Sequence, residues 1–344
     1  MNFASDNTAG AHPRIMAALA AANDGHAPSY GADALTRWAE GLVRELFEAP
    51  QAEVFLVPSG TATNALALAT LSPPWGNIFC SDSAHVLTSE CGAIPYTTGG
   101  ATLVPVAGEG GLIAPDALAE ALHARSRRDV HAGERAALTL TNATEWGRVY
   151  TPDAVAALTT LARGAGMASH MDGARFANAV AALGCSPADL THRAGIDALS
   201  FGGTKNGAMM LEAVVIFDPA RAGGFDMRRM RAGQLMSKHR FLAAQMIALL
   251  EDGLWLDLAR HANGVAARLG AGLAARGLVP VQPVEANQVF VTLDAGRIAR
   301  ARAAGARFFP WPSVQPEGGA QTVRLVASWA STEAEVDAFL AALD

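Results

Sequence analysis

The chain is poor in cysteine and in aromatic residues. Its three cysteines, Cys80, Cys91 and Cys185, are an odd number without Cys-x-x-Cys spacing, which predicts neither a disulfide framework nor a zinc site. We therefore expect no bound metal and a reduced, cytoplasmic compartment. Aromatic residues make up 6% of the chain, which is too few to favour stacking platforms for single-stranded nucleic acid.

Long apolar stretches and long basic segments are also missing. No uninterrupted apolar stretch reaches the length of a membrane span. The N-terminus has no basic segment followed by an apolar core, so we expect no signal peptide. The net charge is −6, and the arginines at 228, 229 and 231 form only a short cluster. We therefore expect neither a membrane nor a nucleic-acid partner.

Apolar material, by contrast, is abundant. Hydrophobic residues make up 51% of the 344 residues, and this length suggests about two domains. Strand-like and helix-like segments alternate from about residue 54 to 218, which predicts a mostly parallel sheet covered by helices. Two long helical stretches follow from residue 234, and then two strands. We predict an N-terminal segment and large domain over 1–238 and a small α+β domain over 239–344.

A lone lysine follows one of the predicted buried strands. Residues 197–201 form this strand, Gly202 and Gly203 end it, and Thr204 and Lys205 come next. An amine at this place is positioned for covalent chemistry with a carbonyl group. A lysine directed to solvent from a loop is the simpler alternative, which this stretch taken alone favours.

Two further features lie at the ends of predicted strands. Asp172 ends a buried strand, while Ser59, Gly60 and Thr61 join the strand at 54–57 to an alanine-rich helix. The start of such a helix offers free N–H groups and a positive dipole end to a phosphate. The simpler alternatives are a helix N-cap role for Asp172 and an ordinary capped helix after Ser59.

These features fit one cofactor. In mostly parallel sheets ligands bind at the carboxyl ends of the strands, so we expect the amine, the carboxylate and the phosphate cradle to meet. Together they suit pyridoxal 5'-phosphate. Lys205 would form a Schiff base with its aldehyde, and Asp172 would keep the pyridine nitrogen protonated.

Eight short motifs spread over the whole chain resemble those of the low-specificity L-threonine aldolases, including their phenylserine aldolase branch. The most specific are HMDGARF and FGGTKNG, and in chain order the eight occupy residues 3–7, 30–33, 59–62, 84–85, 90–93, 170–176, 201–207 and 231–235. The resemblance implies an α/β, aspartate-aminotransferase-like (fold type I) transferase fold. It also implies a homo-oligomer, in which dimers share active sites, usually within a tetramer.

The resemblance also implies roles for matching residues. Cofactor contacts are implied for Lys205, Asp172, Gly60, Thr61, His85, Arg175 and Thr204, and for Arg231 from a neighbouring subunit. Substrate contacts are implied for Ser5, Tyr30, Arg175 and Arg324, with Tyr30 entering a partner's site. An arginine fork matches a carboxylate. The alternatives are structural ion pairs for the arginines, a packed aromatic for Tyr30 and a surface loop for His85.

The sequence leaves two histidines as candidates for the proton acceptor. Retro-aldol cleavage requires removal of the β-hydroxyl proton, and His85 and His131 are both candidates. Many threonine aldolases carry a histidine after an Asn-x-Thr motif, whereas Glu145 takes that place here. The chain also departs from the family pattern at residues 94–96 and at Trp146, and we expect these changes to reshape the substrate pocket.

We therefore expect a lyase that cleaves L-3-hydroxy-amino acids to glycine and an aldehyde. The substrates would be L-threonine, L-allo-threonine and L-phenylserine. The same lysine and cofactor also serve a transaldolase, a racemase or a β-eliminating lyase. A homologue that binds the cofactor without catalysis is the alternative outside enzymes.

Overall fold

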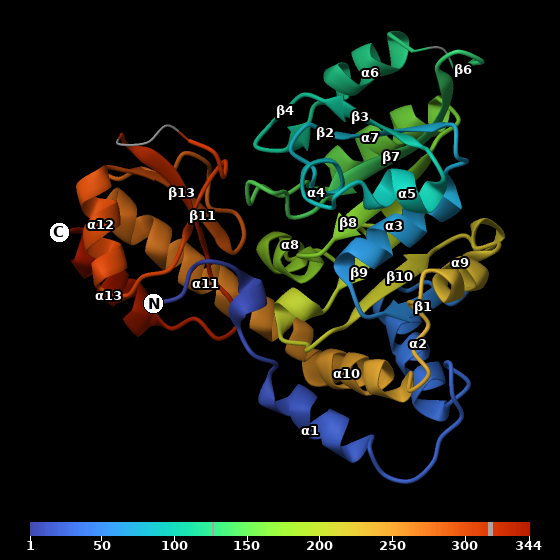
Figure 1. The fold of residues 1–344 in the computed structure, drawn as a ribbon, viewed down its shortest axis with the longest axis horizontal. Helices are drawn as coiled ribbons and strands as arrows, with labels where there is room; N and C mark the ends of the chain where they lie inside the picture. Colours follow the sequence, from blue (N-terminus) through green and yellow to red (C-terminus); the bar gives the residue numbers. More distant parts are fainter. Residues whose placement is uncertain (126, 316–318) are drawn as a thin grey trace.

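The computed structural model describes residues 1–125, 127–315 and 319–344 (Figure 1). A large sheet with strand order β1-β10-β9-β8-β7-β2-β3 forms its centre, and β6 pairs with β7 beside this path. These strands are β1 (Glu53–Val57), β2 (Gly76–Ser81), β3 (Thr102–Val106), β6 (Arg128–Asp129), β7 (Gly133–Thr141), β8 (Ala168–Gly173), β9 (Ala198–Gly202) and β10 (Glu212–Ile216).

Most of this sheet is parallel, as predicted. Strands β3, β2, β7, β8 and β9 pair in parallel with their neighbours, whereas β10 runs antiparallel to both β1 and β9. Because β10 is reversed, its first residue, Glu212, lies opposite Val57 and Gly202, the last residues of its neighbours. A residue that begins β10 therefore reaches the sheet edge at which the other strands end.

Helices cover both faces of the sheet (Figure 1). One face packs in a large apolar core against α1 (Pro13–Ala21), α2 (Ala34–Leu46), α6 (Pro115–His123), α7 (Pro152–Gly164), α8 (Phe176–Leu183) and α10 (Arg240–Leu250). The other face packs against α3 (Gly60–Leu71), α4 (His85–Thr88), α5 (Ala93–Thr98) and α9 (Phe225–Arg231). Burial on both faces explains why the central strands are continuous apolar runs.

The C-terminal part forms a smaller sheet with helices. Its antiparallel strand order is β11-β13-β12, and α13 begins with the capping box that Thr332 and Glu335 predict. The elements here are α11 (Leu254–Ala274), β11 (Gln288–Leu293), α12 (Ala295–Ala303), β12 (Phe309–Pro310), β13 (Gln321–Val326) and α13 (Glu333–Leu343). A short hairpin of β4 (Gly108–Glu109) and β5 (Leu112–Ile113) lies apart.

The two cores meet along α11. Leu258 packs in the large core and Val265 in the small one, while α10, which follows residue 238, packs in the large core. The first residues of the chain cross to the small core, where Phe3 is fully buried. The division at 238/239 stays a prediction. Among the described residues, none of the helices combines the length and apolar character that a membrane crossing needs.

Candidate active site

A cavity of about 370 Å³ lies at the sheet edge where β1, β7, β8 and β9 end. Both domains contribute to its wall, because Trp311 and Arg324 of the small domain line it together with residues of the large one. The structure brings together nine of the predicted site residues here: Ser5, Gly60, Thr61, His85, Asp172, Arg175, Thr204, Lys205 and Arg324. Ligands of such sheets bind at this edge.

Three predicted residues lie outside the cavity wall of this chain. Tyr30 and Arg231 are exposed, and both were assigned to a neighbouring subunit's site, which a single chain does not contain. His131 lies in the exposed turn between β6 and β7, where its backbone N–H donates to Asp129 at 2.8 Å. Of the two candidate histidines, the geometry therefore places only His85 in the cavity wall.

The start of α3 forms an open cradle of hydrogen-bond donors. Ser59 is the N-cap residue, yet its hydroxyl makes no capping bond, while the Thr63 hydroxyl donates back to the Gly60 carbonyl. The first N–H groups of a helix have no partner within the helix. A phosphate suits these free donors, as the sequence predicted.

Lys205 lies in a short turn, Thr204–Asn206, directly after β9. Its neighbours fix the turn: Leu211 N–H donates to the Thr204 hydroxyl at 3.0 Å, and Asn206 Nδ2 donates to the Trp255 carbonyl at 2.6 Å. Gly207 has φ +94°, and a Cβ there would approach Leu258 to 2.9 Å, so the turn requires glycine. The Lys205 ammonium has no ion pair within the described part of the chain, and it remains available to a ligand.

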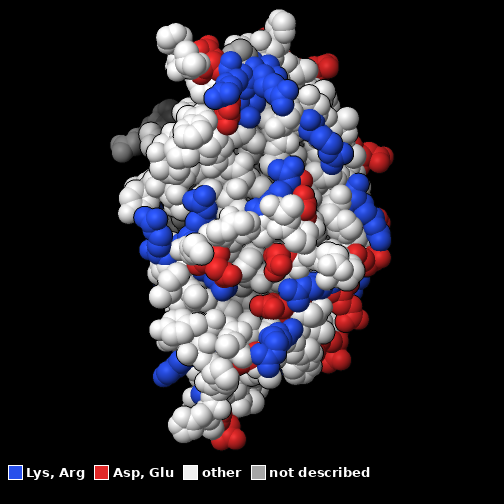
Figure 2. Space-filling view, turned by 90° about the vertical axis from the view of Figure 1, so that its right-hand side faces the viewer, with Lys and Arg blue, Asp and Glu red and all other residues white. Residues whose placement is uncertain are grey.

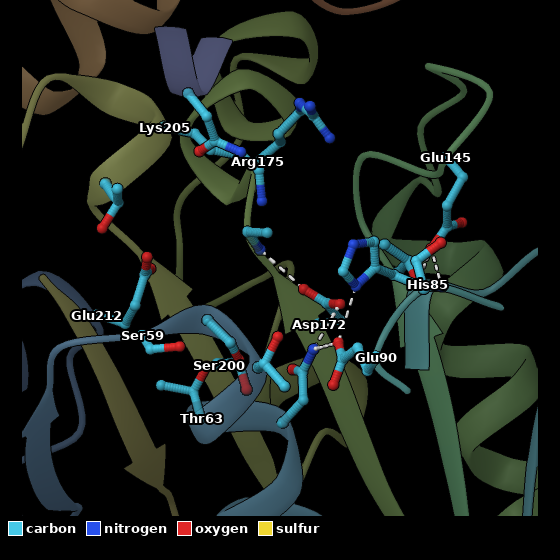
Figure 3. A pocket seen from close by; sticks show the side chains of 18 of the residues that line it. Ser59, Thr63, His85, Glu90, Glu145, Asp172, Arg175, Ser200, Lys205 and Glu212 are labelled. Atoms are coloured by element: carbon cyan, nitrogen blue, oxygen red, sulfur yellow. Dashed lines mark hydrogen bonds and ion pairs between the residues drawn. The ribbon is translucent and has the colours of Figure 1, made fainter. Parts of the chain in front are cut away.

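A buried hydrogen-bonded chain joins Asp172 to His85 (Figure 3). Asn64 Nδ2 donates to Asp172 Oδ2 at 2.8 Å and to Glu90 Oε1 at 2.9 Å. His85 Nδ1 lies 2.9 Å from the same Glu90 oxygen. The other Asp172 oxygen accepts the Ala174 N–H at 3.0 Å. The carboxylate is thus fixed in place without a cationic partner of its own.

The two arginines of the cavity differ in their partners. Arg175 donates from Nε and Nη2 to both oxygens of Asp6, at 2.7 and 2.9 Å. Burial alone would raise the pKa of Asp6, but the charge and hydrogen bonds of Arg175, together with the Lys205 charge and a hydrogen bond from Asn287, hold the pKa below its usual value. Arg175 therefore forms a structural ion pair, as the alternative interpretation predicted, and it also lines the cavity.

Arg324 is a partly buried cation without an ion pair to an acid among the described residues. It lies on β13, with its guanidinium carbon 4.6 Å from the centre of the Trp311 ring, a cation–π contact. Its buried Nε has no hydrogen-bond partner in the described chain. Burial, reinforced by the charge of Arg175, lowers the pKa of Arg324 to about 10. Such a group favours an anion beside it.

Two buried acids on opposite sides of the cavity were not predicted as site residues. Glu145 Oε1 accepts the His85 backbone N–H at 2.7 Å and the Thr141 hydroxyl at 3.0 Å. Burial, together with the charge of Asp172, raises the pKa of Glu145 to about 7. Burial likewise raises the pKa of Glu212 to about 7, although the Lys205 charge acts in the opposite direction.

Comparison with known proteins identifies the family. Residues 2–296 match a family model described as beta-eliminating lyase. The chain is 44% identical, over 97% of its length and 94% of the relative's, to a low specificity L-threonine aldolase from a Pseudomonas species. It is 45% identical, over 95% of its length and 92% of the relative's, to one from Pseudomonas aeruginosa. The chain belongs to the low-specificity L-threonine aldolase family.

Solved structures agree with this assignment. The chain is similar to a threonine aldolase from Leishmania major, with a TM-score of 0.93, 31% identity and coverage of 99% of this chain and 98% of that one. A Sphingomonas wittichii serine palmitoyltransferase, 15% identical, has a TM-score of 0.71 over 100% of this chain and 86% of its own, which shows the fold alone. The predicted family, fold type I architecture and pyridoxal phosphate cofactor are confirmed.

Proposed function

We propose that this protein is an aldehyde-lyase that cleaves L-threonine, L-allo-threonine and L-phenylserine to glycine and the corresponding aldehyde. One observation carries the substrate class: the guanidinium of Arg324, whose Nε has no hydrogen-bond partner among the described residues, lines the same cavity as Lys205 and Asp172. An α-amino acid brings a carboxylate to that guanidinium while its amino group reaches the lysine end of the cavity. Family membership supports the reaction.

The residues at the sheet edge fit pyridoxal phosphate. The α3 cradle, with Gly60 and Thr61, offers N–H donors to the phosphate, and Lys205 and Thr204 lie in the turn after β9. Asp172 offers an oxygen to the pyridine nitrogen, and His85 and Arg175 complete the wall. When bound, the cofactor withdraws electrons from the Cα–Cβ bond that breaks.

His85 is the proposed acceptor of the β-hydroxyl proton. Asn64 donates to the Glu90 oxygen that lies 2.9 Å from His85 Nδ1, so an ionised Glu90 takes its second hydrogen bond from Nδ1–H. This tautomer leaves Nε2 unprotonated and able to accept a proton. Glu145 fixes the backbone of the same histidine.

Arg324 is the proposed binder of the substrate carboxylate, with Ser5 and Arg175 beside it. Asp6 neutralises Arg175, whereas Trp311 supports Arg324 without neutralising it. An arginine with an unused fork gains most from a carboxylate. Orientation of the substrate by this contact would align the bond that breaks.

The proposed oligomer shares its sites between subunits, with Tyr30 and Arg231 entering a neighbour's cavity. Tyr30 is 51% exposed, and Met227 and Met230 of α9 are exposed beside Arg231. Figure 2 shows the face seen at the right of Figure 1, where uncharged surface separates groups of interspersed acidic and basic side chains. Exposed apolar side chains such as Met227 and Met230 favour association. We also propose a cytoplasmic location. We further propose a tetramer, whose mass light scattering of the purified protein would measure.

The experiment is incubation with L-threonine and L-phenylserine while glycine and aldehyde are measured. We expect both products in equal amounts, and none from a Lys205→Ala variant, which also loses the visible absorbance of bound cofactor. Lys238 is the only other lysine in the sequence, so Lys238→Ala is the matched control and should stay active. Ammonia and a 2-oxo acid would instead indicate β-elimination, and cofactor binding without turnover would indicate a non-catalytic homologue.

A further inference from the structure

Glu212 is a buried carboxyl group beside the phosphate cradle. Because β10 is reversed within the sheet, its first residue lies between the end of β1, which leads into α3, and the end of β9, which leads to Lys205. The residue is 6% exposed and lines the cavity. An acid at this point is unexpected, since an anion is to bind at the start of α3.

One oxygen of the Glu212 carboxyl group faces the lysine turn, and the other faces the start of α3. Oε2 accepts the Gly203 N–H at 3.0 Å, which fixes the side chain to the lysine turn. Oε1 lies 3.9 Å from where a Cβ on Gly60 would stand, so it borders the first residue of α3. Figure 3 shows Glu212 beside Ser59 at the same side of the cavity. A phosphate in the cradle would therefore contact or closely approach Oε1.

The charges around Glu212 leave its ionisation finely balanced. Burial raises its pKa to about 7, the Lys205 charge and the hydrogen bonds from Thr204 and Gly203 lower it, and the Asp172 charge raises it. From β1 and α3, the cavity receives no charged side chain: besides backbone, it is lined by the hydroxyls of Ser59, Thr61 and Thr63 and by the amide of Asn64. A phosphate monoester carries a charge of about −1.5 to −2 at pH 7. Its arrival adds a like charge, which disfavours the ionised carboxylate.

We propose that Glu212 takes up a proton when a phosphate group enters the cradle, and that it then donates a hydrogen bond to that phosphate. The protonated acid becomes one more donor beside the helix N–H groups. Cofactor binding is thereby coupled to pH through Glu212. This residue is separate from Asp172, which would hold the pyridine nitrogen, and from Arg324, which would hold the substrate carboxylate. This inference depends on the proposed function, because it requires pyridoxal phosphate in the cavity.

The test starts from cofactor-depleted protein and measures the dissociation constant of added pyridoxal phosphate at several pH values between about 6.5 and 9. Pyridoxal, which lacks the phosphate but reacts with the same lysine, is measured in parallel. Glu212→Gln keeps a hydrogen-bond donor and removes the titration. Glu145→Gln is the matched control, because it replaces the other buried acid, on the far side of the cavity beside His85 (Figure 3).

We expect affinity of the wild type for pyridoxal phosphate to fall with rising pH more steeply than that of Glu212→Gln, by up to about tenfold per pH unit above pH 7. The steeper dependence should persist in Glu145→Gln and should be absent with pyridoxal. Calorimetry in two buffers of different ionisation enthalpy should show about one more proton taken up by wild type than by Glu212→Gln. The phosphorus-31 shift of the bound cofactor reports whether the phosphate itself has taken that proton.

Equal pH dependence and equal proton uptake in wild type and Glu212→Gln would overturn the proposal, as would a proton found on the phosphate. If Glu212→Gln does not fold, the excess proton uptake of wild type with pyridoxal phosphate over pyridoxal, at unchanged phosphate ionisation, decides the question. Failure of the wild type to bind either compound would instead overturn the proposed function. Tight binding without the Glu212 effect would leave the proposed function standing.

Discussion

His85 Nδ1 lies 2.9 Å from Oε1 of Glu90, whose side chain is fully buried. The same oxygen accepts Asn64 Nδ2, and the other Glu90 oxygen is buried with no partner in the described chain. The arrangement orients the imidazole from behind, as carboxylates do in other acid–base sites. With His85 as the proposed proton acceptor, we expect Glu90 to be a positioning residue that acts on the reaction through His85.

Replacement of Glu90 by glutamine should therefore reduce kcat for L-threonine cleavage about 10- to 100-fold, part of the usual effect of general-base catalysis. The Michaelis constant and the absorbance of bound cofactor should change little, because the fully buried Glu90 side chain bonds to His85 and Asn64 and glutamine keeps its size. The decisive measurement combines Glu90→Gln with His85→Asn. If Glu90 acts through His85, the second substitution adds no further loss. Additive losses would contradict the positioning role.

The choice between the two histidines can be tested by parallel variants. His85 lines the cavity, whereas His131 is exposed in the β6–β7 turn. We expect His85→Asn to lose about 100-fold or more in kcat and His131→Asn to stay within about twofold of wild type. The reverse result would assign the proton acceptor to His131 of a neighbouring subunit, and a mixed oligomer of His131→Asn and Lys205→Ala subunits would then recover activity.

Removal of the Arg324 guanidinium should weaken substrate binding and leave the cofactor in place. A buried charged contact is worth about 2 kcal/mol or more, so Arg324→Met should lower kcat/KM for L-threonine at least about 30-fold. Arg297→Met is the control, because Arg297 lies outside the cavity wall, is partly exposed and is paired with Asp294. An unchanged kcat/KM in Arg324→Met would assign the substrate carboxylate to Arg175.

The buried acid Glu145 should make stability depend on pH. Its pKa is raised to about 7 in the folded chain from 4.5, so the folded state binds more protons than the unfolded state between these values. Its contribution to stability is complete below pH 4.5 and is lost as pH rises to 7. At about 1.4 kcal/mol for each pKa unit, the loss is about 3 kcal/mol.

Urea unfolding of cofactor-depleted protein at pH 5 and pH 8 measures this effect. Between pH 5 and pH 8, Glu145→Gln should lose less unfolding free energy than wild type, since the amide cannot ionise. Glu109→Gln, at an exposed acid, should show the wild-type pH dependence. A Glu145→Gln variant with that same dependence would show that the carboxyl ionises freely in the folded chain.

The sequence was sufficient for the features that depend on local pattern. The break after a buried strand located Lys205, and the strand–glycine–helix order located the start of α3. Asp172 was expected at a strand end, and there it was found. These positions follow from the alternation of strands and helices, which places the ends of parallel strands at one edge.

The remaining site residues depend on contacts between distant parts of the chain. Asn64 lies within an alanine-rich helix, and its two acceptors are 26 and 108 residues away, so no local spacing marks it. Glu212 reaches the cavity only because β10 is antiparallel, and strand direction is not visible in an apolar run. Glu90 lies in one of the recognised motifs, yet its role emerges only from its contact with His85.

The first loop of the chain is fastened at both ends of the cleft: Phe3 is enclosed by the small core, and Asp6 is bound to Arg175 of the large domain. The terminal amino group itself lies 3.7 Å from Glu335. A purification tag fused at Met1 would therefore begin next to these contacts. Loss of this segment would leave the mostly buried Arg175 without its acidic partner Asp6.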